Sequence, residues 1–147
     1  MKLLLIISFS LTIALAHANY ALQEIPAASV NAQYQALVQD DDDISWSLYS
    51  YAGYNAIGCY LDGHLVAMIA YRNGSAANEV HMGIIFVKKA HRKRGLPKWM
   101  IADFEAKMRS MGKKKVTVQA VQDTSGMYSH FGYLHVSTGS QDMYKML

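Results

Sequence analysis

A change of hydrophobic period at Val87 limits the possible folds of this chain more than any other feature. Residues 79–87 have the pattern of a strand, whereas the apolar residues beyond Val87 recur at helical spacing. Between the two lies the segment 88–98, in which six of eleven residues are Lys or Arg. A strand that enters a basic, glycine-containing loop and then a helix brings unpaired N–H groups and the positive end of the helix dipole to one point. The segment therefore predicts a site for phosphate or pyrophosphate.

Two other interpretations of segment 88–98 each explain only part of it. A structural loop would account for Gly95 but not for the clustered bases, and a solvated basic face would account for the bases but not for their place before a helix. The net charge of the chain is +3, but residues 88–147 hold twelve bases against four acids, and residues 19–87 hold one base against seven acids. This asymmetry favours an anion in the second half, while the acidic half could attract a cation.

The length and composition predict a single domain. A chain of 147 residues with 52% hydrophobic and 17% charged residues can close one core without disulfides or a structural metal. Because Cys59 is the only cysteine, an intramolecular disulfide and every multi-cysteine zinc scaffold are excluded. We expect Cys59 itself to be a small buried residue of a strand.

The first eighteen residues resemble a cleavable signal peptide. Lys2 precedes an apolar run from Leu3 to Ala16, and the sequence Ala-His-Ala at 16–18 is a small-x-small cleavage signal. Fourteen residues are too few for a membrane span of about 20 residues. The alternative is a buried apolar element of the fold. With cleavage, the domain would comprise residues 19–147 and the protein would be exported, either periplasmic or secreted; without it, the protein would be cytoplasmic.

Hydrophobic spacing and turn residues predict most of the elements of the domain. Strands are expected at 20–25, 56–61, 64–71, 79–87, 116–120, 133–137 and 143–147, and helices from Val30 to the acidic run 40–43, from Pro97 to Met111 and at 124–131. Gly112 suits the position after the end of the long helix, and Met100, Met108 and Met111 are expected on its core face. The state of the aromatic stretch 46–54 stays open.

The basic segment resembles motif A of the GNAT superfamily of N-acetyltransferases. That motif has Arg or Gln, two residues, Gly, one residue and then Gly or Ala, after a strand that ends in Val. Val87, Arg92 and Gly95 match in register, whereas Pro97 stands where the family has Gly or Ala. Proline lacks the N–H that could contact a pyrophosphate, although it suits the first turn of a helix.

A second stretch, Tyr-Ser-His-Phe-Gly-Tyr at 128–133, resembles motif B of the same superfamily. It follows motif A at the family's distance, with one helix and one strand between them, and residues 143–147 resemble the family's closing strand. The resemblance is specific over residues 79–133 and looser before Ala56. It implies an α+β fold with a mixed, mostly antiparallel twisted sheet of six to seven strands and helices on both faces.

The resemblance also implies acetyl-coenzyme A as cosubstrate and a set of residues that bind it. In this family the cosubstrate lies between two strands that splay apart, here the strand that ends at Val87 and the strand 116–121. The main chain of Phe86 and Val87 would hold the pantetheine arm, and one N–H would polarise the thioester carbonyl. Arg92, Lys93 or Lys98 would approach the 3′-phosphate. The N–H groups expected to face the pyrophosphate are those of Lys93, Arg94, Gly95, Leu96 and Lys98.

Direct attack of an amine on the thioester requires two proton transfers. An amine with a pKa of about 10 must lose a proton, and Glu79 or His81, on one face of the strand, would accept it. Glu79 could instead simply begin the strand at the surface. Tyr128 stands where the family's tyrosine protonates the departing thiolate. The alternative for Tyr128 is a core tyrosine whose hydroxyl bonds to the main chain.

Other classes of function have weaker support in the sequence. The six His are scattered without metal-ligand spacing, so we predict no metal, and Gly-x-Ser-x-Gly does not occur. The bases cluster at one loop with few aromatics between them, which argues against a nucleic-acid-binding domain. We therefore expect an acetyl-coenzyme A-dependent N-acetyltransferase that acts on a small-molecule or protein amine, with no membrane insertion after cleavage and with a homodimer as one possible state. The alternative is a non-catalytic binding module that keeps this fold.

Overall fold

The computed structural model describes residues 19–40 and 44–147, so the predicted leader and most of the acidic run lie outside the described residues. Ten main elements follow one another within these ranges, and each predicted bound lies within two residues of the observed one. They are β1 (Tyr20–Ile25), α2 (Val30–Asp40), β2 (Asn55–Leu61), β3 (His64–Asn73), β4 (Glu79–Val87), α3 (Leu96–Ser110), β5 (Lys115–Gln119), α4 (Ser125–His130), β6 (Leu134–His135) and β7 (Asp142–Met146).

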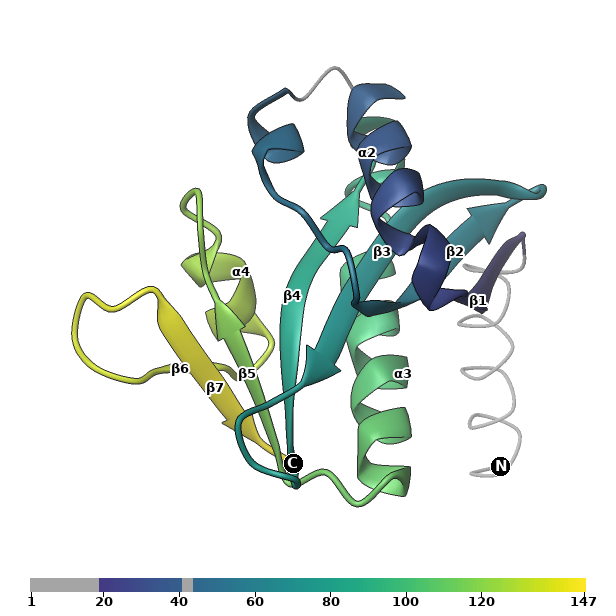
Figure 1. Ribbon diagram of the computed structural model, residues 1–147. Helices are drawn as coiled ribbons and strands as arrows, with labels where there is room; N and C mark the ends of the chain where they lie inside the picture. The colour runs from purple at the N-terminus through teal and green to yellow at the C-terminus, as the bar shows by residue number, and fades with distance from the viewer. Residues whose placement is uncertain (1–18, 41–43) are drawn as a thin grey trace, which may run out of the picture.

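The strands form one seven-stranded sheet in the order β1-β2-β3-β4-β5-β7-β6 (Figure 1). Neighbouring strands run antiparallel except β4 and β5, which are parallel and are connected through α3. A parallel pair needs a crossover connection, and the long helix predicted after Val87 provides it. The mixed, mostly antiparallel sheet confirms the predicted α+β fold.

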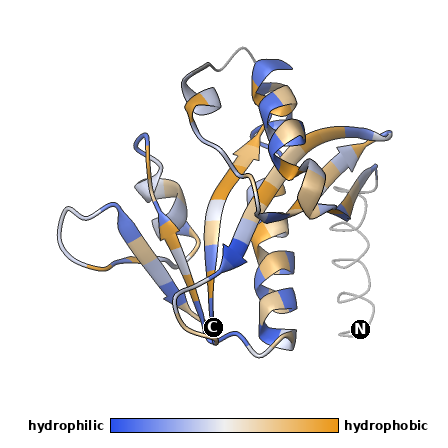
Figure 2. Cartoon of the chain, in the orientation of Figure 1, coloured by the Kyte–Doolittle hydropathy of each residue, from blue (hydrophilic) through white to orange (hydrophobic). Residues whose placement is uncertain are grey.

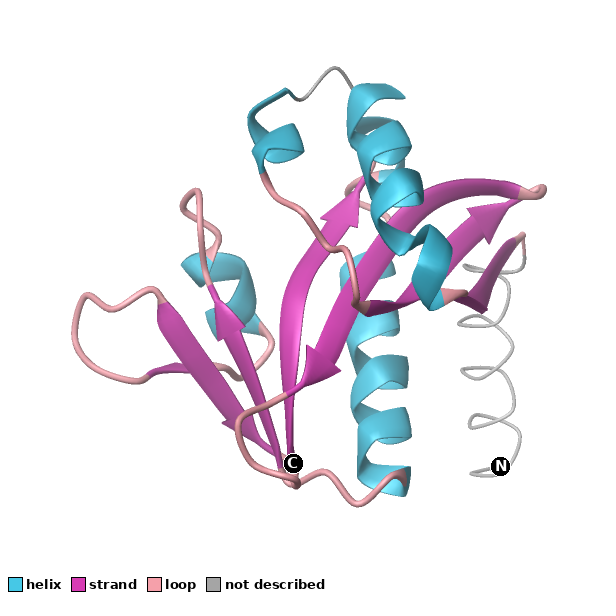
Figure 3. Ribbon diagram, viewed as in Figure 1, coloured by secondary structure: helices cyan, strands magenta, loops and turns pink. Residues whose placement is uncertain are grey.

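Helices cover both faces of the sheet and create two cores (Figure 3). On one face α3 and α4 pack against β3, β4 and β5, with Phe104 and Met82 fully buried among them. On the other face α2 packs against β3 and β4, where Tyr34 of the helix lies in one core cluster with Met68 and Phe86. Figure 2 shows that β4 is most hydrophobic toward its C-terminal end, where residues 84–87 are all buried because both faces are covered there.

The ends of α3 follow from its sequence. Pro97 occupies the first turn, where its missing N–H has no helical carbonyl to bond. At the other end Gly112 adopts a left-handed φ of 82°, and the N–H of Lys113 donates to the carbonyl of Met108 over 3.0 Å, which closes the helix as a Schellman motif. Met111 caps the helix and is 58% exposed, so its predicted place in the core was wrong.

A buried carboxylate joins α3 to the C-terminal segment of the chain. Glu105 is 4% exposed, and it accepts hydrogen bonds from the Tyr133 hydroxyl at 3.0 Å and from Nζ of Lys145 at 2.9 Å.

Cys59 is buried as predicted, and burial raises the pKa of its thiol to about 11. None of the helices in the described ranges is both long enough and apolar enough to cross a membrane.

Candidate functional site

A bulge in β4 separates β4 from β5. Ala70 of β3 pairs with Ile84 and Tyr71 pairs with Met82, so Gly83 is an extra residue on β4. The parallel pairing of β4 with β5 runs only from Glu79 to Met82 and does not continue beyond the bulge. The two strands therefore diverge toward their C-terminal ends (Figure 1). This divergence is the splay that the sequence resemblance implied for the strand ending at Val87.

Packing requires a glycine at the bulge. A Cβ atom at Gly83 would lie 2.7 Å from Cε2 of Tyr54 and 2.8 Å from Cε1 of Tyr51, closer than any side chain tolerates. The tyrosine rings thus approach the main chain of β4 directly, and the hydroxyl of Tyr51 donates to the carbonyl of Gly83 over 3.5 Å. The stretch 46–54, whose state the sequence left open, places these rings beside the splayed edge.

The splay opens a cleft of about 260 Å³ between the end of β4 and the start of α4. We call it the loop cleft. It contains two of the residues predicted to hold the pantetheine arm, Phe86 and Val87, together with Arg92 of the basic segment. The residues that line the loop cleft are Trp46, Ile85, Phe86, Val87, Arg92, Pro97, Thr124 and Met127.

The basic segment bends sharply before α3 begins. Lys93 and Gly95 both adopt a left-handed φ, of 62° and 73°, and the first helical hydrogen bond runs from the N–H of Trp99 to the carbonyl of Gly95 over 3.2 Å. The N–H groups of Leu96 and Lys98 lie in the first turn, where a helix offers them no carbonyl. Two main-chain donors and the positive end of the helix dipole thus lie beside Pro97 at the loop cleft, and Arg92 is the base of the segment that lines it, while Arg94 bonds to Tyr20 and Lys88 pairs with Asp40.

Arg92 is bound to the strand that precedes it. Its Nε donates to the carbonyl of Val87 over 2.9 Å, and its guanidinium lies 5.8 Å from the centre of the Phe86 ring. The side chain therefore reinforces the turn from β4 into the basic segment. It also lines the loop cleft, where the guanidinium adds positive charge to the wall.

A second contact ties the basic segment to β1. Nη1 of Arg94 donates to the hydroxyl of Tyr20 over 2.9 Å, and the same hydroxyl hydrogen-bonds with Nδ1 of His91 at 3.1 Å. Burial, followed by the charges of Arg94 and Lys88, lowers the pKa of His91, so the ring is neutral at pH 7. Sequence reasoning missed this tether, because Tyr20 lies 74 residues from Arg94 along the chain.

Tyr128 of α4 lies in the core between α4 and the splayed edge of β4. It is buried, its ring meets Tyr133 edge to face at a centroid distance of 5.9 Å, and it forms a hydrogen bond with the main chain of Ile85. Burial raises the pKa of the hydroxyl, which stays protonated at neutral pH. Tyr128 itself lines neither the loop cleft nor the cleft around His81, whereas its hydrogen-bond partner Ile85 and Thr124, one helical turn before it, line the loop cleft.

A second cleft, of about 150 Å³, lies beside the loop cleft along the same strand. We call it the tyrosine cleft. Gly83 lines it, and Ile85, two residues further along β4, lines the loop cleft. The residues that line the tyrosine cleft are Tyr49, Ser50, Tyr51, Tyr54, His81, Gly83, Gln119 and Val121.

His81 is the predicted base that reaches a cleft. Its Nδ1 hydrogen-bonds with Oγ1 of Thr117 on β5 at 2.9 Å. Burial, followed by the charge of Arg72, lowers the pKa of His81 below its ordinary value of 6.5, against a smaller opposing effect of Asp142. The imidazole is therefore neutral at pH 7 and is able to accept a proton.

Glu79, the other predicted base, lies at the closed end of the β4–β5 pair. Its Oε2 accepts a hydrogen bond from the Ser75 hydroxyl over 3.1 Å, and its Oε1 lies 3.8 Å from Nζ of Lys115. It lines neither the loop cleft nor the tyrosine cleft. Although alternation puts Glu79 and His81 on one face, only His81, nearer to the point where β4 and β5 separate, lines the tyrosine cleft.

The structure adds functional candidates that the sequence did not single out. Trp46, Tyr49 and Tyr54 have no periodic pattern, and Gly83 looked like any glycine in a strand. Gln119 ends β5 at the point of divergence and faces the tyrosine cleft. Among the described residues, no group of three His, Cys, Asp or Glu side chains is arranged to hold a metal ion.

Comparison with known proteins agrees with this architecture. Residues 19–133 match the model of the acetyltransferase (GNAT) family. A search of curated proteins by sequence gave no match.

Three solved structures illustrate the likeness of fold. N-acetylglutamate synthase from Neisseria gonorrhoeae, complexed with coenzyme A and N-acetyl-glutamate, has a TM-score of 0.69 at 12% identity and covers 87% of this chain and 35% of its own. PaiA N-acetyltransferase from Thermoplasma acidophilum, in complex with coenzyme A, has a TM-score of 0.61 at 13% identity, with 87% and 99% covered. An acetyltransferase from Thermus thermophilus has a TM-score of 0.64 at 12% identity, with 88% and 97% covered.

Proposed function

Because the chain belongs to the acetyltransferase (GNAT) family, we propose that it is an acetyl-coenzyme A-dependent N-acetyltransferase that moves an acetyl group to a primary amine by direct attack on the thioester. The observation that carries the proposal is the separation of β4 from β5 at Gly83, which opens the loop cleft next to the basic segment. Two of the similar structures contain coenzyme A, which supports this choice of cosubstrate.

The loop cleft and the start of α3 offer groups that suit the pyrophosphate and the pantetheine arm of coenzyme A. A pyrophosphate would accept hydrogen bonds from the N–H groups of Leu96 and Lys98 at the start of α3. The apolar wall formed by Phe86 and Met127 would exclude water from the pantetheine arm, and the edge of β4 that β5 leaves unpaired beyond Met82 would bind that arm as a neighbouring strand does. Coenzyme A would supply the acetyl group as a thioester, whose sulfur leaves with the electron pair.

The tyrosine cleft and His81 would serve the amine. An imidazole that donates from Nδ1 to Thr117 keeps its lone pair on Nε2, and this lone pair would accept the proton that the amine must lose, directly or through one water. Tyr128, kept protonated by burial, would give its hydroxyl proton to the departing sulfur. His81 lines the tyrosine cleft, and Tyr128 bonds to Ile85 of the loop cleft, so a thioester held between the two clefts would have the proton acceptor on one side and the proton donor on the other.

Calorimetric titration with coenzyme A tests the binding half of the proposal. We expect a variant with Arg92→Ala and Lys93→Ala to bind at least tenfold more weakly, because charge-assisted hydrogen bonds contribute about 1.5–3 kcal/mol each. A matched control, Arg109→Ala with Lys114→Ala, removes the same charge at the other end of α3 and should bind as the unaltered protein does. Equal affinities of the two variants would contradict the phosphate assignment, and no binding at millimolar coenzyme A would refute the proposed function.

Release of free thiol from acetyl-coenzyme A in the presence of amines tests the catalytic half. Tyr128→Phe keeps the packing of the ring and should lower kcat about 10²-fold, within the range of general acid catalysis, while coenzyme A affinity stays unchanged. The competing function is a non-catalytic module, which Pro97 favours because it removes one N–H from the motif. Tight binding of acetyl-coenzyme A with no transfer to any amine would select that module.

A further inference from the structure

The tyrosine cleft contains no carboxylate of its own. Its eight lining residues supply hydroxyl, amide and imidazole groups, and none of them is Asp or Glu. A cleft built to attract a polyamine or another multiply charged cation would place acids there. The volume of about 150 Å³ also lies below the roughly 300–1,000 Å³ of pockets that hold drug-sized ligands. The cleft therefore suits a small acceptor that does not depend on positive charge for recognition.

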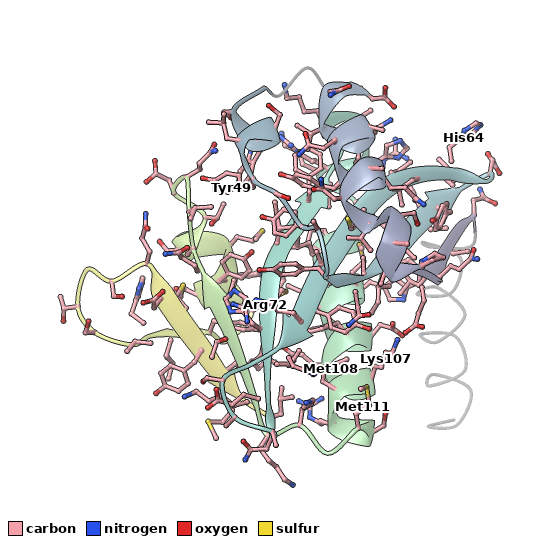
Figure 4. All side chains as sticks on the ribbon, viewed as in Figure 1. Tyr49, His64, Arg72, Lys107, Met108 and Met111 are labelled. Atoms are coloured by element: carbon pink, nitrogen blue, oxygen red, sulfur yellow. The ribbon has the colours of Figure 1, made fainter. Side chains whose placement is uncertain are left out.

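Arg72 lies beside this cleft without lining it, and it bonds to the hydroxyl of Tyr54 in the cleft wall. It stands directly opposite His81 in the antiparallel pairing of β3 with β4, and directly opposed residues project from the same face of a sheet with Cβ atoms about 5 Å apart. Its neighbour Tyr71 faces the other way, into the core against α3. Figure 4 shows Arg72 beside β4 and below Tyr49, a residue of the cleft wall.

The guanidinium of Arg72 is held in place but has donors to spare. Nε donates to the Tyr54 hydroxyl over 3.1 Å, Nη1 donates to the carbonyl of Asn73 over 3.1 Å, and the group lies 5.7 Å from the centre of the Tyr54 ring. Among the described residues, no carboxylate lies within ion-pair distance of it. A guanidinium has five N–H donors, so an orientated positive group with unused donors stands next to the base.

His81 lies between a positive charge on β3 and a negative charge on β7. Arg72 acts on His81 from the β3 side, and Asp142 of β7 acts more weakly from the other side. The remaining nearby charges, Glu79 and Lys115, face each other at 3.8 Å and offset one another. A molecule that carries both an amino group and a carboxylate matches this arrangement, with its carboxylate toward Arg72 and its amino group toward His81.

Resting on the proposed function, we propose that the acceptor is an amino acid or a similar small amine that carries a carboxylate, and that Arg72 binds this carboxylate. The guanidinium would hold the carboxylate in a two-bond fork and so orient the amino group toward His81. Arg72 is thus a specificity-determining residue of the tyrosine cleft, and it takes no part in the proton transfers.

The test uses pairs of acceptors in which the carboxylate of one is replaced by a neutral amide in the other. A panel of L-amino acids is assayed beside the corresponding amino acid amides, with acetyl-coenzyme A in excess. We expect at least one acid to be acetylated with a kcat/KM at least tenfold above that of its amide. Arg72→Met should lower kcat/KM for that acid about 10- to 100-fold, mainly through KM, and should lower it for the amide by at least tenfold less.

Two further variants separate charge from geometry and from general effects. Arg72→Lys keeps the charge but not the fork, so its effect should lie between those of the unaltered protein and Arg72→Met. Arg109→Met removes an arginine of α3 far from both clefts and should leave the preference for the acid unchanged. The thermal unfolding of Arg72→Met, Arg72→Lys and Arg109→Met is measured as a control, and each should show a cooperative transition like that of the unaltered protein.

The outcomes distinguish this inference from the function on which it rests. Acetylation of amides as fast as of acids, or an equal loss for both acceptors in Arg72→Met, would overturn the carboxylate assignment and leave the N-acetyltransferase standing. If no acceptor reacts, binding of the same pairs to the protein saturated with coenzyme A is measured by NMR. A preference for the acids that Arg72→Met abolishes would then support the carboxylate site without the transfer reaction, and no preference would overturn it.

Discussion

Replacing Glu105 should destabilise the fold more than replacing an exposed carboxylate does. The Glu105 carboxylate is 4% exposed and is bonded to two partners on different elements, the Tyr133 hydroxyl at 3.0 Å and Nζ of Lys145 at 2.9 Å. Burial, followed by the charge of Glu105, raises the pKa of Tyr133, so this hydroxyl stays protonated and donates. In Glu105→Ala the buried hydroxyl loses its acceptor and Lys145 loses its counter-ion.

The structure allows the size of this effect to be worked out. Removing one partner of a buried ion pair costs about 3–5 kcal/mol, and the lower part of that range applies because the side chain of Lys145 is 27% exposed and reaches water. The Tyr133 hydroxyl left without an acceptor adds about 1–3 kcal/mol. We therefore expect Glu105→Ala to lower the free energy of unfolding by about 4 kcal/mol. Glu105→Gln retains an acceptor for Tyr133 and should cost about 2 kcal/mol.

Equilibrium unfolding in urea, followed by intrinsic fluorescence, measures these differences. At an m-value of about 2 kcal/mol per molar urea, the midpoint of Glu105→Ala should fall by about 2 M. Glu24→Gln is the matched control, since Glu24 pairs with Lys107 of the same helix but is 65% exposed, and it should change stability by less than about 1 kcal/mol. If Glu105→Ala and Glu24→Gln have equal midpoints, the reasoning from burial is refuted.

Three further predictions concern the site and the helix end. Because the pKa of His81 is lowered in the fold, kcat/KM should fall only below pH 6.5, and His81→Gln should abolish that dependence. Stability should also decline below about pH 6.5, where the unfolded chain binds this proton first, and a decline confined to higher pH would contradict the assignment. Gly83→Ala should destabilise the fold by about 1–3 kcal/mol, since the new Cβ collides with Tyr51 and Tyr54, and unchanged thermal unfolding would show that the rings move freely. Gly112→Ala should cost about 1 kcal/mol because φ is 82° there, and an unchanged urea midpoint would argue against the cap.

Local patterns account for the elements that the sequence predicted correctly. The bounds of β4 match those expected, and α3 begins and ends within one residue of Pro97 and Met111 because Pro and Gly act on the backbone where they stand. The same patterns failed for the side chain of Met111. Helical spacing put it on the core face, but the helix ends at Ser110 and the chain turns away before any strand covers that position.

The candidate site could be predicted only in part for a related reason. The basic segment is contiguous, so the anion site before α3 was predicted from the order of residues, and the resemblance to motif A added Arg92 and Gly95. Arg72 appeared only as the single base of an acidic half, and nothing near it in sequence indicates His81 as its neighbour. Their juxtaposition arises from strand register, which depends on pairing between residues that are far apart along the chain.

The order of strands and helices and the basic turn before α3 follow from the amino-acid sequence. They depend on backbone preferences and on hydrophobic period, which act over a few residues. The bulge of β4 at Gly83, the position of His81 rather than Glu79 in a cleft and the burial of Glu105 arise only in the folded molecule. Each of these depends on contacts between distant segments, and packing selects among them only when the whole core closes.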